Sequence, residues 1–420
     1  MGGEGKPSAR RSSRNDRSSV LSLEEPRTVG LALLSAAMAF VTLTFSMLYV
    51  LVPLAGVNLG ASPVTVGLLV SSGHVLPMLL AMRLGRLADQ IGARRILAFG
   101  AIGALLMPFA FVLTPGLLTL AMTQFVSGLF HVCLAIASQS LVASLGHEGT
   151  HERNFAWYMT FLSVGQLGGP IAAGVIVDTY GYQVAFASLM ATSAIALILI
   201  GLIHRLSIID ITPVGDRSTH GNGHIRRIGS NVGVQLAVLG SCGVLTAIAV
   251  RQAFMPVYLL ENAFSATSIG MLLSLRALAA VAVRPMMPRI IRLLGGRARA
   301  LVVMVILVAL GVGALGFTTS FVVLAGLSLL AGIGTGVGMP LSIVTIASHV
   351  QPHERATALA LRLTVNRGAQ LVTPFLIGAA IGLLGYGASF FITGGLLIVV
   401  AIFILRLTPA FERSERITSL

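Results

Sequence analysis

The sequence predicts an all-α membrane protein with twelve transmembrane helices in two pseudo-symmetric six-helix bundles. Three observations predict this fold class: an apolar composition, an internal repeat and an uneven distribution of arginine. Of the 420 residues, 55% are hydrophobic and only 10% are charged, and the mean hydropathy is +0.92. Water-soluble domains carry about 25% charged residues, so this composition places the chain in a lipid bilayer.

Apolar runs locate the expected helices, because about 20 apolar residues cross the hydrocarbon core of a bilayer. Between polar, glycine or proline breaks, the runs of the first half lie near 28–54, 64–83, 95–114, 117–144, 153–177 and 182–204, and those of the second half near 231–259, 267–288, 299–317, 320–348, 357–383 and 386–407. The predicted units are a basic, disordered tail (1–27), a helix bundle (28–204), a polar linker (205–230), a second bundle (231–407) and a C-terminal tail (408–420).

The two halves carry the same landmarks at an offset of 203 or 204 residues. A constant offset across several helix pairs predicts an internal duplication. The landmarks Ser62, Gly67, Ser71, Gly128, Gln166, Pro170, Gly174, Gly181 and Tyr182 return as Ser265, Gly270, Ser274, Gly332, Gln370, Pro374, Gly378, Gly385 and Tyr386.

Arginine predicts the orientation in the membrane, because lysine and arginine collect in cytoplasmic loops. Arginines crowd the N-terminal tail and the segments 83–95, 205–227 and 284–299, whereas the predicted loops on the other side contain no lysine or arginine. Both termini are therefore predicted to be cytoplasmic, in the plasma membrane, which for a bacterium is the inner membrane. Topology also explains the net charge of +14, so we expect no nucleic-acid partner.

The sequence carries no pattern typical of an enzyme or of a metal site. Cys133 and Cys242 fall inside predicted helices, and the linker pair His220 and His224 has no third ligand nearby. We expect no catalytic residue, no metal and no cofactor, and we expect the chain to act as a monomer within the lipid bilayer.

Polar side chains inside the predicted helices are candidates for contact with a small molecule, because ionisable groups at membrane depth are usually functional. Arg276 and Arg367 fall near mid-helix, and none of the 14 acidic residues does. An anionic ligand would therefore be their natural partner. The predicted binding set is Arg276, Arg367, Gln370, Asn366, Gln166, His74, His131, Gln252 and Arg251.

Other roles for these residues stay open. The arginines could bond backbone carbonyls, and Arg251 could extend to the membrane interface. His74 and His131 are either packing residues or proton carriers, since histidine titrates near neutral pH.

A compact polar stretch, GRLADQIGARR, separates the second and third predicted helices. Its residues Gly85, Asp89, Gly92, Arg94 and Arg95 match the G-x-x-x-D-x-x-G-x-R-R signature, and with the duplication the chain resembles the major facilitator superfamily over nearly its whole length. The resemblance implies that Asp89 meets the start of the eleventh helix, near 353–356, and acts as a latch that closes the cytoplasmic side.

The fifth predicted helix carries a second motif, formed by Gly165, Gly169, Pro170 and Gly174. It resembles the G-x-x-x-G-P-x-x-G-G element of antiporters, notably drug:proton exporters, with Ala173 in place of one glycine. Close helix packing is the alternative interpretation. The arginine that such exporters carry four residues before a glycine in helix four is Gln124 here.

The resemblance implies a secondary active transporter that moves a small organic solute by alternating access, with efflux by proton antiport. Two alternatives stay open. One is an importer or facilitator of an organic anion, such as a carboxylate metabolite or a siderophore. The other is a membrane receptor that does not transport.

Overall fold

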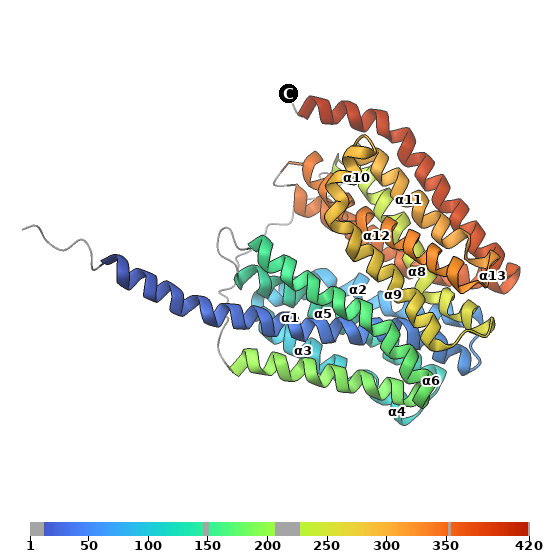
Figure 1. The fold of residues 1–420 in the computed structure, drawn as a ribbon, viewed down its shortest axis with the longest axis horizontal. Coiled ribbons are helices and arrows are strands. Elements are labelled where there is room, and N and C mark those ends of the chain that lie inside the picture. Colours follow the sequence, from blue (N-terminus) through green and yellow to red (C-terminus); the bar gives the residue numbers. More distant parts are fainter. Residues whose placement is uncertain (1–11, 146–150, 206–226, 352–353, 419–420) are drawn as a thin grey trace, which may run out of the picture.

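The computed structural model describes residues 12–145, 151–205, 227–351 and 354–418 (Figure 1). Within these ranges every regular element is a helix. The first half contains α1 (Ser12–Asn58), α2 (Pro63–Ile91), α3 (Ala93–Leu106), α4 (Phe109–Leu113), α5 (Leu117–Leu145) and α6 (His151–Arg205). The second half contains α8 (Val232–Glu261), α9 (Ala266–Val283), η1 (Arg284–Met286), α10 (Met287–Leu293), α11 (Arg297–Gly313), η2 (Leu315–Phe317), α12 (Phe321–His349) and α13 (Arg355–Thr418).

Ten helical segments of the described chain are long and apolar enough to cross a membrane. Two of them, of 53 residues in α6 and 57 in α13, are far longer than the others. At 1.5 Å per residue, each would extend about 80 Å if it were straight, against a hydrocarbon core of about 30 Å. Each contains one non-helical glycine, Gly181 with φ 82° and Gly385 with φ 79°. Two crossings in each segment would give the predicted count of twelve.

The duplication is visible in the helix ends. Ser62 and Ser265 cap α2 and α9, and the hydroxyl of each accepts a hydrogen bond of 3.2 Å from the backbone N–H three residues later. This is the usual N-cap geometry of serine. Gly181 and Gly385 hold equivalent left-handed conformations, which glycine adopts without a steric penalty.

The two halves touch closely at one end of the molecule, which we call the closed end and which holds the starts of α2 and α9 (Figure 1). A Cβ atom at Gly67 would overlap the carbonyl of Pro374, and one at Gly270 would overlap the carbonyl of Pro170. Glycine is therefore required where α2 crosses α13 and where α9 crosses α6.

The halves separate toward the opposite end, which we call the open end (Figure 1). It holds the start of α1 and the end of α13. Figure 1 shows the first half, α1 to α6, diverging there from the second half, α8 to α13.

Both predicted tails differ from the sequence-based expectation where the structure describes them. α1 begins at Ser12, so a helix occupies residues that we expected to be disordered. α13 continues to Thr418. Phe411 is fully buried and stacks on His349 at a ring separation of 4.2 Å, and Glu412 pairs with Arg299 at 3.2 Å. Phe411 and Glu412, beyond the predicted bundle boundary at 407, therefore pack on the second bundle. Most of the predicted linker lies outside the described residues.

Candidate functional site

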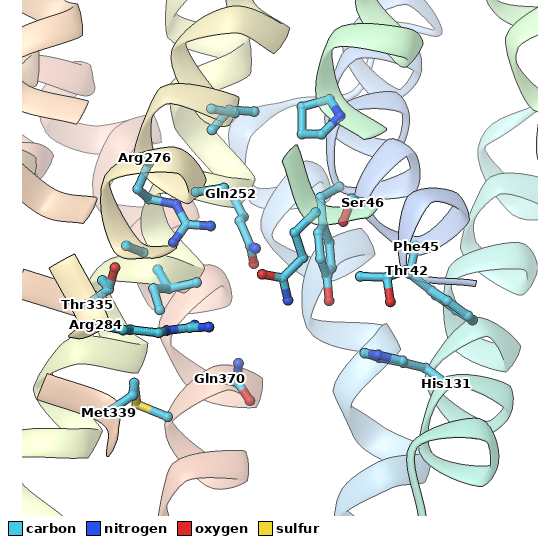
Figure 2. A pocket seen from close by; sticks show the side chains of 17 residues that line it. Thr42, Phe45, Ser46, His131, Gln252, Arg276, Arg284, Thr335, Met339 and Gln370 are labelled. Carbon is cyan, nitrogen blue, oxygen red and sulfur yellow. The ribbon is translucent and has the colours of Figure 1, made fainter. Parts of the chain in front are cut away.

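A cavity of about 320 Å³ lies between the two halves (Figure 2). This volume is at the lower end of the range for small-molecule sites, about 300 to 1,000 Å³. Seventeen residues line it, from α1, α5 and α6 of the first half and from α8, α9, η1, α12 and α13 of the second half. A site shared by two repeated halves is the usual location of the solute in transporters built from repeats.

The wall from the first half is polar and carries no acidic or arginine side chain. Thr42, Ser46 and Tyr49 come from α1, and Gln166 comes from α6. His131 comes from α5, and its ring stacks on Phe45 at 4.6 Å. This wall offers hydroxyl and amide groups beside aromatic faces.

The wall from the second half is cationic. Arg276 of α9 and Arg284 of η1 line the cavity together with Gln252, Thr335 and Gln370 (Figure 2). Neither arginine donates a hydrogen bond to the residues that the structure describes, and Nε of Arg284 is buried without a partner. Unlike paired arginines, these two leave their donors available to a bound molecule.

Arg367 lies one helical turn from the cavity residue Gln370, and its Nη1 donates to Oε1 of Gln370 at 3.3 Å. Its charge acts on Tyr49, His74 and His131 across the interface between the halves. Five of the predicted binding residues therefore line the cavity: Arg276, Gln370, Gln166, His131 and Gln252. A sixth, Arg367, does not line it but contacts the lining residue Gln370. The predicted residue His74 is not among those that line the cavity, although it lies near His131 and Arg367.

Arg251 and Asn366 require a correction, because the structure places both outside the cavity lining. Arg251 is only 1% exposed and donates to the carbonyl of Gly311 at 2.6 Å and to Oγ of Ser328 at 2.8 Å. The Asn366 side-chain oxygen accepts a hydrogen bond of 3.0 Å from Ser241. Both side chains therefore connect helices inside the second bundle instead of facing the other half.

Sequence reasoning missed several lining residues. Thr42, Ser46 and Tyr49 occupy one face of α1, and their spacing of four and three residues is a helical polar stripe that could have indicated them. Arg284 was assigned to a cytoplasmic loop with its neighbouring arginines. Only the packing of η1 against the cavity shows that its side chain faces inward.

The latch motif lies at the open end, between α2 and α3. Gly92 has φ 93° and separates the two helices, as its place in the motif requires. A Cβ at Gly85 would meet no atom within 4 Å. The side chain of Asp89 and residue 353 lie outside the described residues, and the latch contact stays a prediction. Arg95 is exposed, and Arg94 has two buried donor nitrogens without a partner in the described chain.

The helix-five element packs α6 against its neighbours. Cβ atoms at Gly165 and Gly169 would collide with the backbone of α1, and one at Gly174 would collide with Ala266 of α9. The carbonyl of Pro170 contacts Gly270, and Pro170 also lines the cavity. The element therefore provides close packing between the halves beside the site.

Comparisons with known proteins agree with this architecture. A family model described as Major Facilitator Superfamily matches residues 34–227 and 237–418. Over 122 residues the chain is 34% identical to the multidrug resistance protein MdtG of Serratia proteamaculans and 33% identical to that of Salmonella arizonae. These alignments cover 29% of this chain and 29% and 30% of the relatives, so the chain matches less than a third of their length.

Solved structures extend the likeness to nearly the whole chain. A peptide transporter POT in complex with sulfate matches with a TM-score of 0.77 at 13% identity, covering 92% of this chain and 95% of that one. A bacterial homolog of the human lysosomal transporter Spinster matches with a TM-score of 0.69 at 13% identity, covering 93% and 97%. At such identity the likeness concerns the fold. Since the family model spans both halves and the fold agrees with it, this chain is a member of the major facilitator superfamily.

Proposed function

We propose that this protein is a secondary active transporter that exports a small organic solute by alternating access. The observation that carries the proposal is the cavity between the halves, which residues of both halves line and beside which the halves pack closely at one end. In the orientation predicted from arginine, the open end faces the cytoplasm, so solute would enter the cavity from the cytoplasm.

The direction of transport is supported by the relatives and by the helix-five element. Both relatives described above are named multidrug resistance proteins, and the element Gly165, Gly169, Pro170 and Gly174 packs against the cavity. Export also fits the open end, where a cytoplasmic solute would find an accessible site.

Coupling to protons would pass through histidine. Gln124 is buried, and its amide packs on Gly73 of α2, so the usual helix-four position supplies no titratable group. Among the seventeen lining residues, His131 is the only histidine, the side chain most often used to carry a proton. We propose His131 as the proton-carrying residue, with His74 near it as a second titratable group.

Proteoliposomes test this function. Purified protein is reconstituted, and uptake of a fluorescent dansyl amide, dansylglycinamide, is measured with and without an acidic vesicle interior. Proton antiport predicts concentrative uptake only with the gradient. His131→Asn is expected to abolish the response to the gradient while preserving downhill flux, because asparagine keeps hydrogen bonding but cannot titrate.

The same vesicles address the alternative, an importer or facilitator. Equilibration of the amide without any response to the pH gradient would support a facilitator and contradict antiport. Absence of flux for every compound tested would contradict transport itself and support a receptor.

A further inference from the structure

The cavity has two chemically different walls, and this asymmetry identifies a class of solute. On one side stand the uncharged hydroxyl, amide and aromatic groups of the first half, and on the other side stand Arg276 and Arg284. None of the seventeen lining residues is aspartate or glutamate. A cation would therefore meet positive charge without compensation.

The arginines in the helices of the second half differ in their hydrogen-bond partners. Arg251 and Arg362 donate to protein groups: Nη1 and Nη2 of Arg251 bond Gly311 and Ser328, leaving only its Nε without a partner among the described residues, and Nε of Arg362 donates to Ser342 at 3.0 Å. Arg276 and Arg284 have no such partners in the described chain. A guanidinium group at membrane depth needs a hydrogen-bonding or charged partner, and both arginines line the cavity, where a ligand could provide one.

The two unpaired arginines also form a path. They are eight residues apart along α9 and η1, which corresponds to about 12 Å. Arg284 follows the end of α9 and lies toward the open end, and Arg276 lies deeper in the cavity. A negative group entering from the open end would meet Arg284 first and Arg276 second.

We propose that the transported solute is an organic anion with an oxyanion head group, such as a carboxylate, bound by Arg276 and Arg284. Its uncharged body lies against Phe45, Tyr49 and Thr42 of the first half. The inference rests on the proposed transport function and narrows it, because lipophilic cations are excluded. Arg367 adds positive potential at the same place but is tied to Gln370, so it contributes less to direct binding.

The experiment compares three probes that share a dansyl body: dansylglycine with a carboxylate, dansylglycinamide without charge, and dansyl ethylenediamine with an ammonium group. Binding to purified protein in nanodiscs is measured by fluorescence. The wild type is expected to bind the carboxylate about tenfold or more tightly than the amide, which is the range for a charge-assisted hydrogen bond, and to bind the ammonium compound most weakly.

The variants Arg276→Gln and Arg284→Gln are expected to lose this preference while keeping affinity for the amide. Retained amide binding also shows that the variant is folded. Arg292→Gln removes the same charge from an exposed position of α10 and is the matched control, which should behave like the wild type. If one glutamine variant does not fold, the remaining glutamine variant and a lysine substitution at the same position test whether that arginine provides the preference for the carboxylate.

Two results would overturn the inference: equal wild-type affinity for the carboxylate and the amide, or an unchanged preference in both glutamine variants. Measuring the flux of the probes into proteoliposomes distinguishes failure of the anion-binding proposal from failure of the transport proposal. If proteoliposomes move the amide and the carboxylate equally well, transport stands and anion selectivity fails. If the preference in binding is present but none of the probes crosses the membrane, the anion site stands and transport fails.

Discussion

At the scale of single residues, the arginines at membrane depth have two kinds of surroundings. Arg251 is fully enclosed in the second bundle and ties the backbone of α11 to α12 through Gly311 and Ser328. Arg276 and Arg284 face a cavity instead. Since all three sit in or beside apolar helices, residue type and hydropathy do not distinguish them, whereas hydrogen-bond partners do.

This distinction predicts different mutant phenotypes. Arg251→Met should lower the thermal midpoint of the purified protein, because Gly311 and Ser328 each lose a charge-assisted bond worth about 1.5 to 3 kcal/mol. Thermal unfolding in detergent, followed by intrinsic fluorescence, measures the change. The ratio of affinities for the carboxylate and amide probes should stay at the wild-type value. An unchanged midpoint, or a lost preference for the anion, would assign Arg251 to the site instead.

At the scale of helices, the closed end depends on a contact between a side chain and a helix terminus. Oδ1 and Oδ2 of Asp178, in α6, accept hydrogen bonds from the N–H groups of Ala266 and Thr267 at 3.0 and 2.8 Å. These N–H groups belong to the first turn of α9 and have no acceptor within the helix, and the helix dipole favours negative charge at this end. The equivalent position in the second half is Gly382, which has no such group. The contact joins the two halves on one side only.

Asp178 should therefore stabilise the conformation seen here. Asp178→Asn keeps the shape but weakens both bonds and removes the charge, so the closed end should open more often. Distances between spin labels on α6 and α9 at the closed end can be measured by pulsed electron paramagnetic resonance. The variant should show a larger population of long distances between the two labels than the wild type.

Glu261→Gln is the matched control for that measurement. Glu261 is also a carboxylate at the closed end, but it accepts a hydrogen bond of 2.9 Å from Tyr386 within the second half. Its loss should leave the distance distribution between the halves unchanged. If Asp178→Asn behaves in the same way as this control, Asp178 does not hold the halves together.

At the scale of the whole molecule, the two halves share the cavity described above and contact each other closely at one end. Glycine contacts such as Gly67 with Pro374 and Gly270 with Pro170 lie on the closed side, whereas the two halves diverge on the other side (Figure 1). Alternating access then requires the glycine contacts to separate while the region of Gly85 closes.

Accessibility measures this state directly. In a variant without Cys133 and Cys242, Gln166→Cys places a thiol in the cavity. A maleimide that cannot cross membranes should label it quickly in inside-out vesicles and slowly in right-side-out vesicles, because the open end is predicted to be cytoplasmic. Faster labelling in right-side-out vesicles would reverse either the orientation or the resting state.

The sequence by itself determined the membrane class, the two repeated halves and the breaks within α6 and α13. These properties are local: hydropathy needs only composition, and Gly181 and Gly385 mark turns because few other residues accept a positive φ. The same local pattern recovered Arg276, Gln166, His131, Gln252 and Gln370 as polar groups inside helices that line the cavity.

Only the tertiary structure decided which polar groups meet. Each residue along a helix turns by about 100°, so the face of a mid-helix side chain depends on how that helix is rotated against its neighbours. In the packed structure, the side chains of Arg251 and Asn366 bond to groups inside the second bundle. Arg284 and Tyr49 line the cavity instead. Because helix rotation is set by contacts far apart in the chain, the composition of the site emerged from the assembled halves.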